Sequence, residues 1–253
     1  MSGARFWEID ALRGTAVVMM VIFHTVFSLA FFGVREVNVL SGFWRDFALA
    51  TATTFILLAG VSISISSARA GRVLDRRGVA WKNLRRGAGI LLIGMGITLV
   101  TWLVLRGEYI LFGVLHLIGL SIILSPLFLG LGRENLPLGA GIILLAAFIG
   151  GIPGPLPLLW LGIHPADFAS LDYVPLIPWF GVFLAGMGIG ATLYPVGSRG
   201  FPAREQEPRP LAPVTLLGRH SLVLYLVHVP VILAILSLAV PGLGGQILSS
   251  LVP

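Results

Sequence analysis

Long apolar stretches constrain this 253-residue chain more than any other feature of its sequence. Crossing the roughly 30 Å hydrocarbon core of a bilayer takes about 20 residues of helix. Runs of about that length lie near residues 12–34, 46–67, 87–105, 110–130, 136–152, 175–195 and 214–240. Because the bilayer core offers backbone groups no water, runs this long favour helices. We therefore expect an all-α, polytopic membrane bundle of about seven helices.

The composition excludes an ordinary soluble enzyme. Charged residues make up 11% of the chain, against about 25% in soluble domains. The chain has no cysteine, which removes disulfides, thiolate metal ligands and any acyl-cysteine intermediate. Since the segments between the apolar runs are short, the sequence predicts a single membrane domain over residues 1–253.

The placement of the basic residues predicts the orientation. If the runs alternate in direction, 14 of the 17 Lys and Arg residues fall on one side and only Arg35, Arg45 and Arg106 on the other. Cytoplasmic loops carry the excess of Lys and Arg. The N-terminus is therefore expected in the cytoplasm and the C-terminus outside, with 68–86 a basic cytoplasmic loop and 153–174 an outward-facing loop. Because the cations flank apolar spans, the net charge of +6 does not indicate a nucleic-acid partner.

Three histidines lie inside the expected spans. At 1.5 Å per residue, His24, His116 and His228 are roughly 18, 20 and 21 Å from the cytoplasmic edge. Taken singly, each is most simply a hydrogen-bonded structural residue. Together they favour a polar cavity in the outer half of the membrane, because an ionisable group inside a span is costly. No HExxH or comparable pairing accompanies them, so no metal is expected.

Polar residues also recur at helical spacing near these histidines. Asp10 and Arg13 are three residues apart at the cytoplasmic mouth of the first span, which predicts a structural ion pair. Ser221, Tyr225 and His228 form a stripe that should face the protein interior. The glycines of the third and sixth spans predict close helix packing.

Four segments resemble one known group of membrane proteins. The first runs from Arg5 through Glu8-Ile9-Asp10 and Leu12-Arg13-Gly14 to Met20-Val21-Ile22-Phe23-His24. The others are Phe112 to Leu120, Asp172 to Trp179, and Leu217-Gly218-Arg219-His220-Ser221-Leu222 through Tyr225 to His228. In this order they resemble the DUF1624 family, which is related to the catalytic domain of heparan-α-glucosaminide N-acetyltransferase and more distantly to the acyltransferase-3 membrane family.

The resemblance implies a transmembrane acyltransferase. Acetyl-CoA would enter from the cytoplasm, and its acyl group would pass to an acceptor amine or hydroxyl, possibly on a sugar, at the outer side. His24 matches the place of a histidine that acyltransferase-3 proteins require. The catalytic candidates are His24, His116, His228 and Asp172. Basic side chains of the cytoplasmic mouth could attract the CoA phosphates: Arg13, Lys82, Arg85, Arg86, Arg219 and His220.

Two other functions stay open at this point. The histidines could relay protons in a proton-coupled small-molecule transporter, or the chain could be a non-catalytic assembly or sensor protein. In every case we expect a multi-pass protein of the cell membrane with the lipid bilayer around it. The glycine-rich helices would allow a homodimer.

Overall fold

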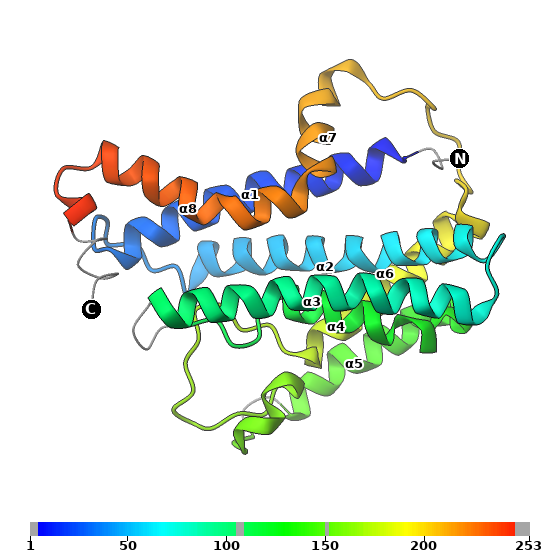
Figure 1. Cartoon of the computed structure of the whole chain (residues 1–253), viewed down its shortest axis with the longest axis horizontal. Coiled ribbons are helices and arrows are strands. Elements are labelled where there is room, and N and C mark those ends of the chain that lie inside the picture. The colour runs from blue at the N-terminus through cyan, green and yellow to red at the C-terminus, as the bar shows by residue number, and fades with distance from the viewer. Residues whose placement is uncertain (1–4, 105–108, 150–151, 246–253) are drawn as a thin grey trace. The chain divides into compact units, whose positions relative to one another are not determined.

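The chain folds into helices. The computed structural model describes residues 5–104, 109–149 and 152–245 (Figure 1). In these ranges there is no strand, only isolated bridges between Phe112 and Tyr173 and between Pro153 and His164. Six of the described helices are long and apolar enough to cross a membrane. The prediction of an all-α polytopic membrane protein is confirmed; Arg106 lies outside the described residues.

The main helices follow the apolar runs of the sequence. They are α1 (Trp7–Phe31), α2 (Gly42–Ala70), α3 (Arg76–Val104), α4 (Val114–Leu124), α5 (Asn135–Ile149), α6 (Leu176–Leu193), α7 (Ala212–Arg219) and α8 (Ser221–Ala239). Short 3-10 segments at 125–127, 129–134 and 156–161 join α4 to α5 and precede α6. The segment at 129–134 runs into α5, and together they form one candidate span, Leu129–Ile149.

The predicted basic loop over 68–86 is wrong in its extent. α2 continues to Ala70 and α3 begins at Arg76, so only residues 71–75 connect them. The prediction ended the helices where the charges begin, but Arg and Lys are good helix formers. Lys82, Arg85 and Arg86 therefore lie on the first turns of α3.

The fourth apolar run is shorter as a helix than its sequence predicts. It was expected over 110–130, but the apolar helix covers Val114–Leu127, with its last turn in 3-10 geometry. Gly113 provides the extended residue before the helix, and Pro126 cannot donate the next backbone hydrogen bond. At 1.5 Å per residue the helix is about 21 Å long, less than the bilayer core.

The described chain forms two compact units, and the single membrane domain over residues 1–253 stays a prediction. The first contains the described residues of 1–55 and 204–253, with α1, the start of α2, α7 and α8. The second contains residues 56–203, with the rest of α2 and α3 to α6. In the second unit, consecutive helices alternate in direction (Figure 1).

Glycines bring the helices of the second unit into backbone contact. A Cβ on Gly60 or Gly186 would overlap the backbone of the facing helix, α6 or α2 respectively. The pairs Gly87 with Gly119 and Gly139 with Gly181 do the same for α3 with α4 and α5 with α6. By contrast, Gly89 and Gly96 face open space. The prediction of close helix packing is therefore confirmed for most of the glycines in the third and sixth spans, but not for Gly89 and Gly96.

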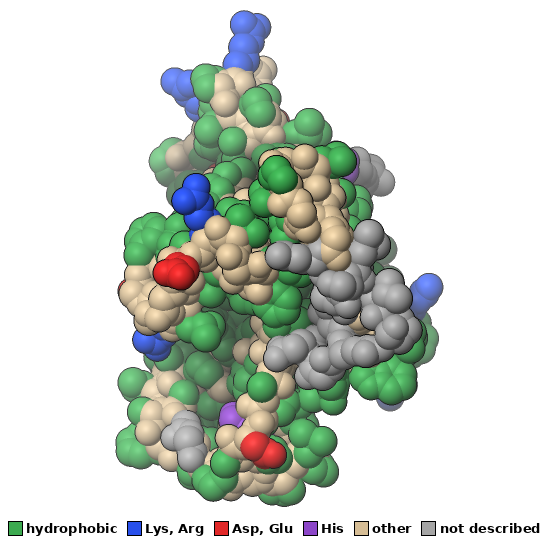
Figure 2. Space-filling view, turned by 90° about the vertical axis from the view of Figure 1, so that its left-hand side faces the viewer, with side chains coloured by type: hydrophobic (Ala, Val, Ile, Leu, Met, Phe, Trp, Pro, Cys, Tyr) green, Lys and Arg blue, Asp and Glu red, His purple; other side chains and the backbone are tan. Residues whose placement is uncertain are grey.

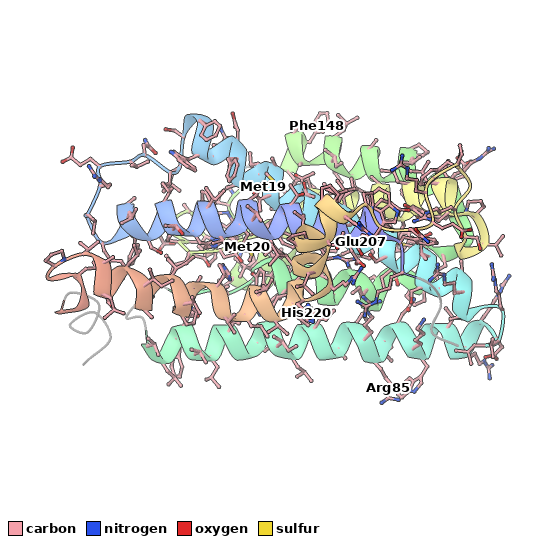
Figure 3. The ribbon with its side chains drawn as sticks, turned by 90° about the horizontal axis from the view of Figure 1, so that it is seen from above. Met19, Met20, Arg85, Phe148, Glu207 and His220 are labelled. Atoms are coloured by element: carbon pink, nitrogen blue, oxygen red, sulfur yellow. The ribbon has the colours of Figure 1, made fainter. Side chains whose placement is uncertain are left out.

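Large apolar side chains cover much of the outside. Leu92, Leu103 and Leu238 are 71%, 68% and 89% exposed. Phe148 on α5 also points outward (Figure 3), and apolar side chains dominate the face in Figure 2. Such surfaces require lipid around them.

Replacing Gly186 with alanine should destabilise the protein, because the new methyl group would overlap the Leu57 carbonyl oxygen. We expect a loss of about 2 kcal/mol, typical of overpacking. Gly96→Ala is the matched control: it adds the same methyl group in open space, and should be neutral or stabilise the helix by up to about 1 kcal/mol. Thermal unfolding in detergent measures both, and equal effects would contradict the packing described.

Candidate active site

Two histidines lie in contact in the first unit. The ring centroids of His24 on α1 and His228 on α8 are 4.6 Å apart, with the rings inclined at 82°. His228 is 8% exposed, and His24 is partly buried. The sequence placed these residues at similar depth on the first and last spans, and the structure joins them as a pair.

Hydrogen bonds determine which ring nitrogen carries the proton. Nδ1 of His24 lies 2.9 Å from the Met20 carbonyl oxygen, and Nδ1 of His228 lies 2.7 Å from that of Tyr225. Since a carbonyl only accepts, Nδ1 carries the hydrogen in each neutral ring and Nε2 keeps a lone pair. Among the described residues, the buried Nε2 of His228 has no hydrogen-bond partner. The pair therefore offers two nitrogens able to accept a proton or a hydrogen bond.

A backbone crossing of α1 and α7 precedes this pair. A Cβ on Gly14 would overlap the Val214 carbonyl, and one on Gly218 would overlap the Asp10 carbonyl. His24 follows Gly14 by ten residues, and His228 follows Gly218 by ten. α1 and α8 run in the same direction (Figure 1), so equal residue counts from the crossing bring both rings to a similar height. The crossing thus sets the register of the histidine pair.

Charged side chains surround the crossing. The buried carboxylate of Asp10 lies 3.1 Å from Arg13 Nη1 and 3.7 Å from Arg219 Nε. Arg219 also pairs with Glu207, whose other carboxylate oxygen accepts a hydrogen bond from Thr215. His220 directly follows α7, and Glu207 lies beside this helix (Figure 3). Arg13 and Arg219 thus face carboxylates of their own unit, and their predicted binding of CoA phosphates stays a prediction.

His116 in the second unit has partners for both ring nitrogens. Its Nδ1 accepts a hydrogen bond of 3.2 Å from the Gly113 N–H, and its Nε2 lies 3.2 Å from the Thr98 hydroxyl. That hydroxyl donates to the Ile110 carbonyl at 2.6 Å, so it accepts from Nε2–H. The ring is 2% exposed and packs against Gly94 of α3. His116 therefore fastens the start of α4 to α3 and leaves no nitrogen for a proton.

Asp172 supports the same helix start. Its Oδ2 accepts a hydrogen bond of 3.1 Å from the Val114 N–H, which satisfies a donor at the N-terminus of α4. A Cβ on Gly113 would overlap this carboxylate. Burial raises the pKa of the Asp172 carboxyl to about 6, although the bond from Val114 acts in the opposite direction.

The predicted phosphate-binding residues of α3 differ in their surroundings. Lys82 donates to the Ser66 carbonyl and hydroxyl oxygens at 3.0 and 2.8 Å. Arg85 and Arg86 are exposed, and Arg85 points away from α3 (Figure 3). His220, between α7 and α8, is also exposed. A cavity that His116 shares with the other two histidines stays a prediction.

Two site residues were not predicted from the sequence. Glu207 lies between two predicted spans, where an acid is ordinary, and only the fold brings it to Arg219. Thr98 is one of many hydroxyls in apolar helices, which usually bond to their own backbone. In the described ranges, no three His, Asp or Glu side chains gather as metal ligands.

Asp172→Asn should reduce the pH dependence of stability. Because burial raises this pKa from 3.8 to about 6, the folded protein holds the proton in a range where the unfolded chain loses it. Stability therefore falls as pH rises from about 4 to about 6, by at most about 3 kcal/mol. The asparagine side chain keeps an oxygen that can accept the hydrogen bond from the Val114 N–H, but it carries no charge at any pH in this range.

Thermal unfolding across this pH range tests the Asp172 prediction. The exposed Asp167→Asn variant serves as control and should follow the wild type. If the stability of the wild type and of Asp172→Asn changed with pH in the same way, the pKa of this carboxyl would not be raised.

Comparison with known proteins relates this arrangement to one family. The family model described as heparan-alpha-glucosaminide N-acetyltransferase, catalytic, matches residues 5–230. This range includes both histidines of the pair, the α1–α7 crossing, His116 and Asp172. No curated protein and no solved structure matches the chain. The family match confirms the resemblance seen in the sequence motifs. Since it covers most of the chain, the protein belongs to the heparan-alpha-glucosaminide N-acetyltransferase catalytic family.

Proposed function

We propose that this protein transfers an acetyl group from acetyl-CoA to an amine across the membrane. Family membership supports a membrane enzyme of the N-acetyltransferase type, with acetyl-CoA as the donor that the family uses. The observation that carries the proposal is the His24–His228 pair, with a lone pair on each Nε2. The distribution of cations supports a cell-membrane protein that takes up the donor from the cytoplasm.

The chemistry requires one proton acceptor. As the amine nitrogen bonds to the carbonyl carbon of the thioester, His24 Nε2 takes the proton that the nitrogen loses. The carbon–sulfur bond then breaks, and its electron pair stays on sulfur. Protonated His24 returns the proton to this thiolate. The products are the acetylated amine and CoA thiol, and His24 ends neutral as it began.

The second imidazole favours an amine over a hydroxyl. A neutral primary amine has two N–H groups, so one can give its proton to His24 while the other donates a hydrogen bond to His228. A hydroxyl has one hydrogen and would leave the buried Nε2 of His228 without a donor, at a cost of about 1–3 kcal/mol. His228 is therefore proposed to orient the acceptor.

The other predicted site residues receive different roles. His116 and Asp172 act as positioning residues, since their polar atoms hold the start of α4. Lys82, Arg85, Arg86 and His220 remain proposed partners of the CoA phosphates. Arg13 and Arg219 are proposed to stabilise the crossing that aligns the histidine pair, because both contact carboxylates there.

Glutamine substitutions separate the two histidines. Glutamine can accept a hydrogen bond but cannot take a proton at neutral pH. We therefore expect His24→Gln to lower kcat by about 100-fold or more, as for loss of a general base. His228→Gln should keep more activity than His228→Ala.

The assay for these variants is acetylation of primary amines by purified protein, with acetyl-CoA binding as the control for folding. Equal activities of the two His228 variants would contradict its role as hydrogen-bond acceptor. Ligand uptake into proteoliposomes without acetyl-CoA, and with no acetyl transfer, would favour a transporter instead.

Arg219 and Arg85 should respond differently to the donor that is offered. If Arg219 acts through the crossing, Arg219→Gln lowers kcat to the same degree with acetyl-CoA and with acetyl-pantetheine, which lacks the nucleotide phosphates. Arg85→Gln should raise KM for acetyl-CoA a few-fold, as for an exposed charge pair, and leave acetyl-pantetheine unaffected. A selective rise in KM for acetyl-CoA in Arg219→Gln would return this residue to phosphate binding.

A further inference from the structure

The second unit contains a cavity with no role in the chemistry above. Its volume is about 230 Å³, and it lies where the last turns of α2 and α6 meet the segment before α5. Its walls are Ser64, Ser67, Ala68, Leu129, Ala191, Tyr194 and Val196. The volume is below the roughly 300–1,000 Å³ of pockets for drug-sized ligands. The cavity therefore suits a slender chain.

Two serines of this cavity differ from the other hydroxyl residues of α2. Thr51, Thr54 and Ser62 each donate to the backbone carbonyl one turn earlier, at 2.6–2.8 Å. Within the described residues, the Ser64 hydroxyl makes no such bond, and that of Ser67 only accepts one. Both hydroxyls are thus available to a ligand.

A buried polar cluster lies directly behind Ser67. Asn83 on α3 is fully buried, and its side-chain amide donates to the hydroxyls of Ser67 and Ser125 at 2.9 and 3.3 Å. No described residue donates to its carbonyl oxygen. Because Asn83 uses Ser67 as an acceptor, the Ser67 hydrogen is left for another group.

Arginines hold the backbone at one side of the cavity. Val196 is 67% exposed and has φ of +55°, a strained conformation for a β-branched residue. Arg72 donates to the Val196 carbonyl at 2.6 Å, and Arg69 donates to the Gly197 carbonyl at 2.8 Å. Two guanidinium groups therefore lie close to a cavity wall that is itself uncharged.

We infer that this cavity receives the pantetheine arm of acetyl-CoA, an inference that rests on the proposed function. The arm is slender, and its amide and hydroxyl groups can pair with Ser64 and Ser67 while its methylene groups contact Ala68, Leu129 and Ala191. Arg69 and Arg72 would then add to the proposed partners of the phosphates at the other end of the arm. Ser64, Ser67 and Arg69 belong to the end of α2, and Arg72 directly follows it, on the side that the cation distribution predicts to be cytoplasmic.

Protection of a single thiol tests the cavity directly. The chain has no cysteine, so Ser64→Cys introduces one thiol with little change in volume. Acetyl-CoA, at about ten times its Kd, should slow alkylation of this thiol about tenfold. Adenosine bisphosphate, which is the nucleotide half of CoA without the pantetheine arm, should not slow the alkylation. In the control Ser41→Cys, where the residue is exposed outside this unit, neither compound should have an effect.

Other protection patterns would overturn the inference. If acetyl-CoA does not protect Ser64→Cys, or if adenosine bisphosphate protects it equally, the arm does not occupy the cavity. Protection by anionic phospholipid vesicles alone would assign the cavity to a lipid headgroup.

Filling the cavity gives a second, independent measurement. Ala191→Leu should weaken acetyl-CoA binding about tenfold, or 1.4 kcal/mol, and leave adenosine bisphosphate binding unchanged. Ala140→Leu adds the same volume at an exposed position of α5. This control variant should bind acetyl-CoA and adenosine bisphosphate like the wild type. If Ala191→Leu binds like the wild type, only the cavity assignment fails. If the wild type itself binds no acetyl-CoA, the proposed function fails.

Discussion

The backbone contact between α1 and α7 is the interaction on which the histidine pair depends. Gly14 and Gly218 let the two helices approach until a Cβ on either would overlap the other backbone. Buried Asp10 lies beside the contact and pairs with arginines of both segments. Because a helix is stiff along its axis, a fixed crossing point determines the height of every later residue. Two sequence motifs about 200 residues apart therefore specify one geometry.

The histidines illustrate how hydrogen bonding separates structural from chemical roles. His24 and His228 direct Nδ1–H to carbonyls of their own helices, which leaves Nε2 unprotonated. His116 has the opposite tautomer, with both nitrogens engaged by Gly113 and Thr98. The sequence predicts a similar depth in the membrane for all three histidines. The partners of the ring nitrogens, rather than burial, distinguish a candidate base from a helix fastener.

Hydropathy was enough to predict the helices but not their ends. The apolar runs corresponded to helices because the bilayer core leaves the backbone no other partner. The ends depend on local chemistry that hydropathy does not measure. Arg76 to Arg86 continue α3 beyond the apolar run because these residues favour helix, whereas His116 and Asp172 begin α4 later than its apolar residues do. The two compact units likewise depend on contacts between distant segments, which local hydropathy does not encode.

The sequence by itself determined the all-α membrane class, the family and the identity of the candidate histidines, because these follow from apolar run length and from motifs within single segments. Tertiary structure decided which candidates meet. It joined His24 to His228, paired Arg219 with Asp10 and Glu207, and occupied both nitrogens of His116. These outcomes depend on helix rotation and register, which are set by contacts between distant segments such as Gly14 and Gly218, and no local pattern carries that information.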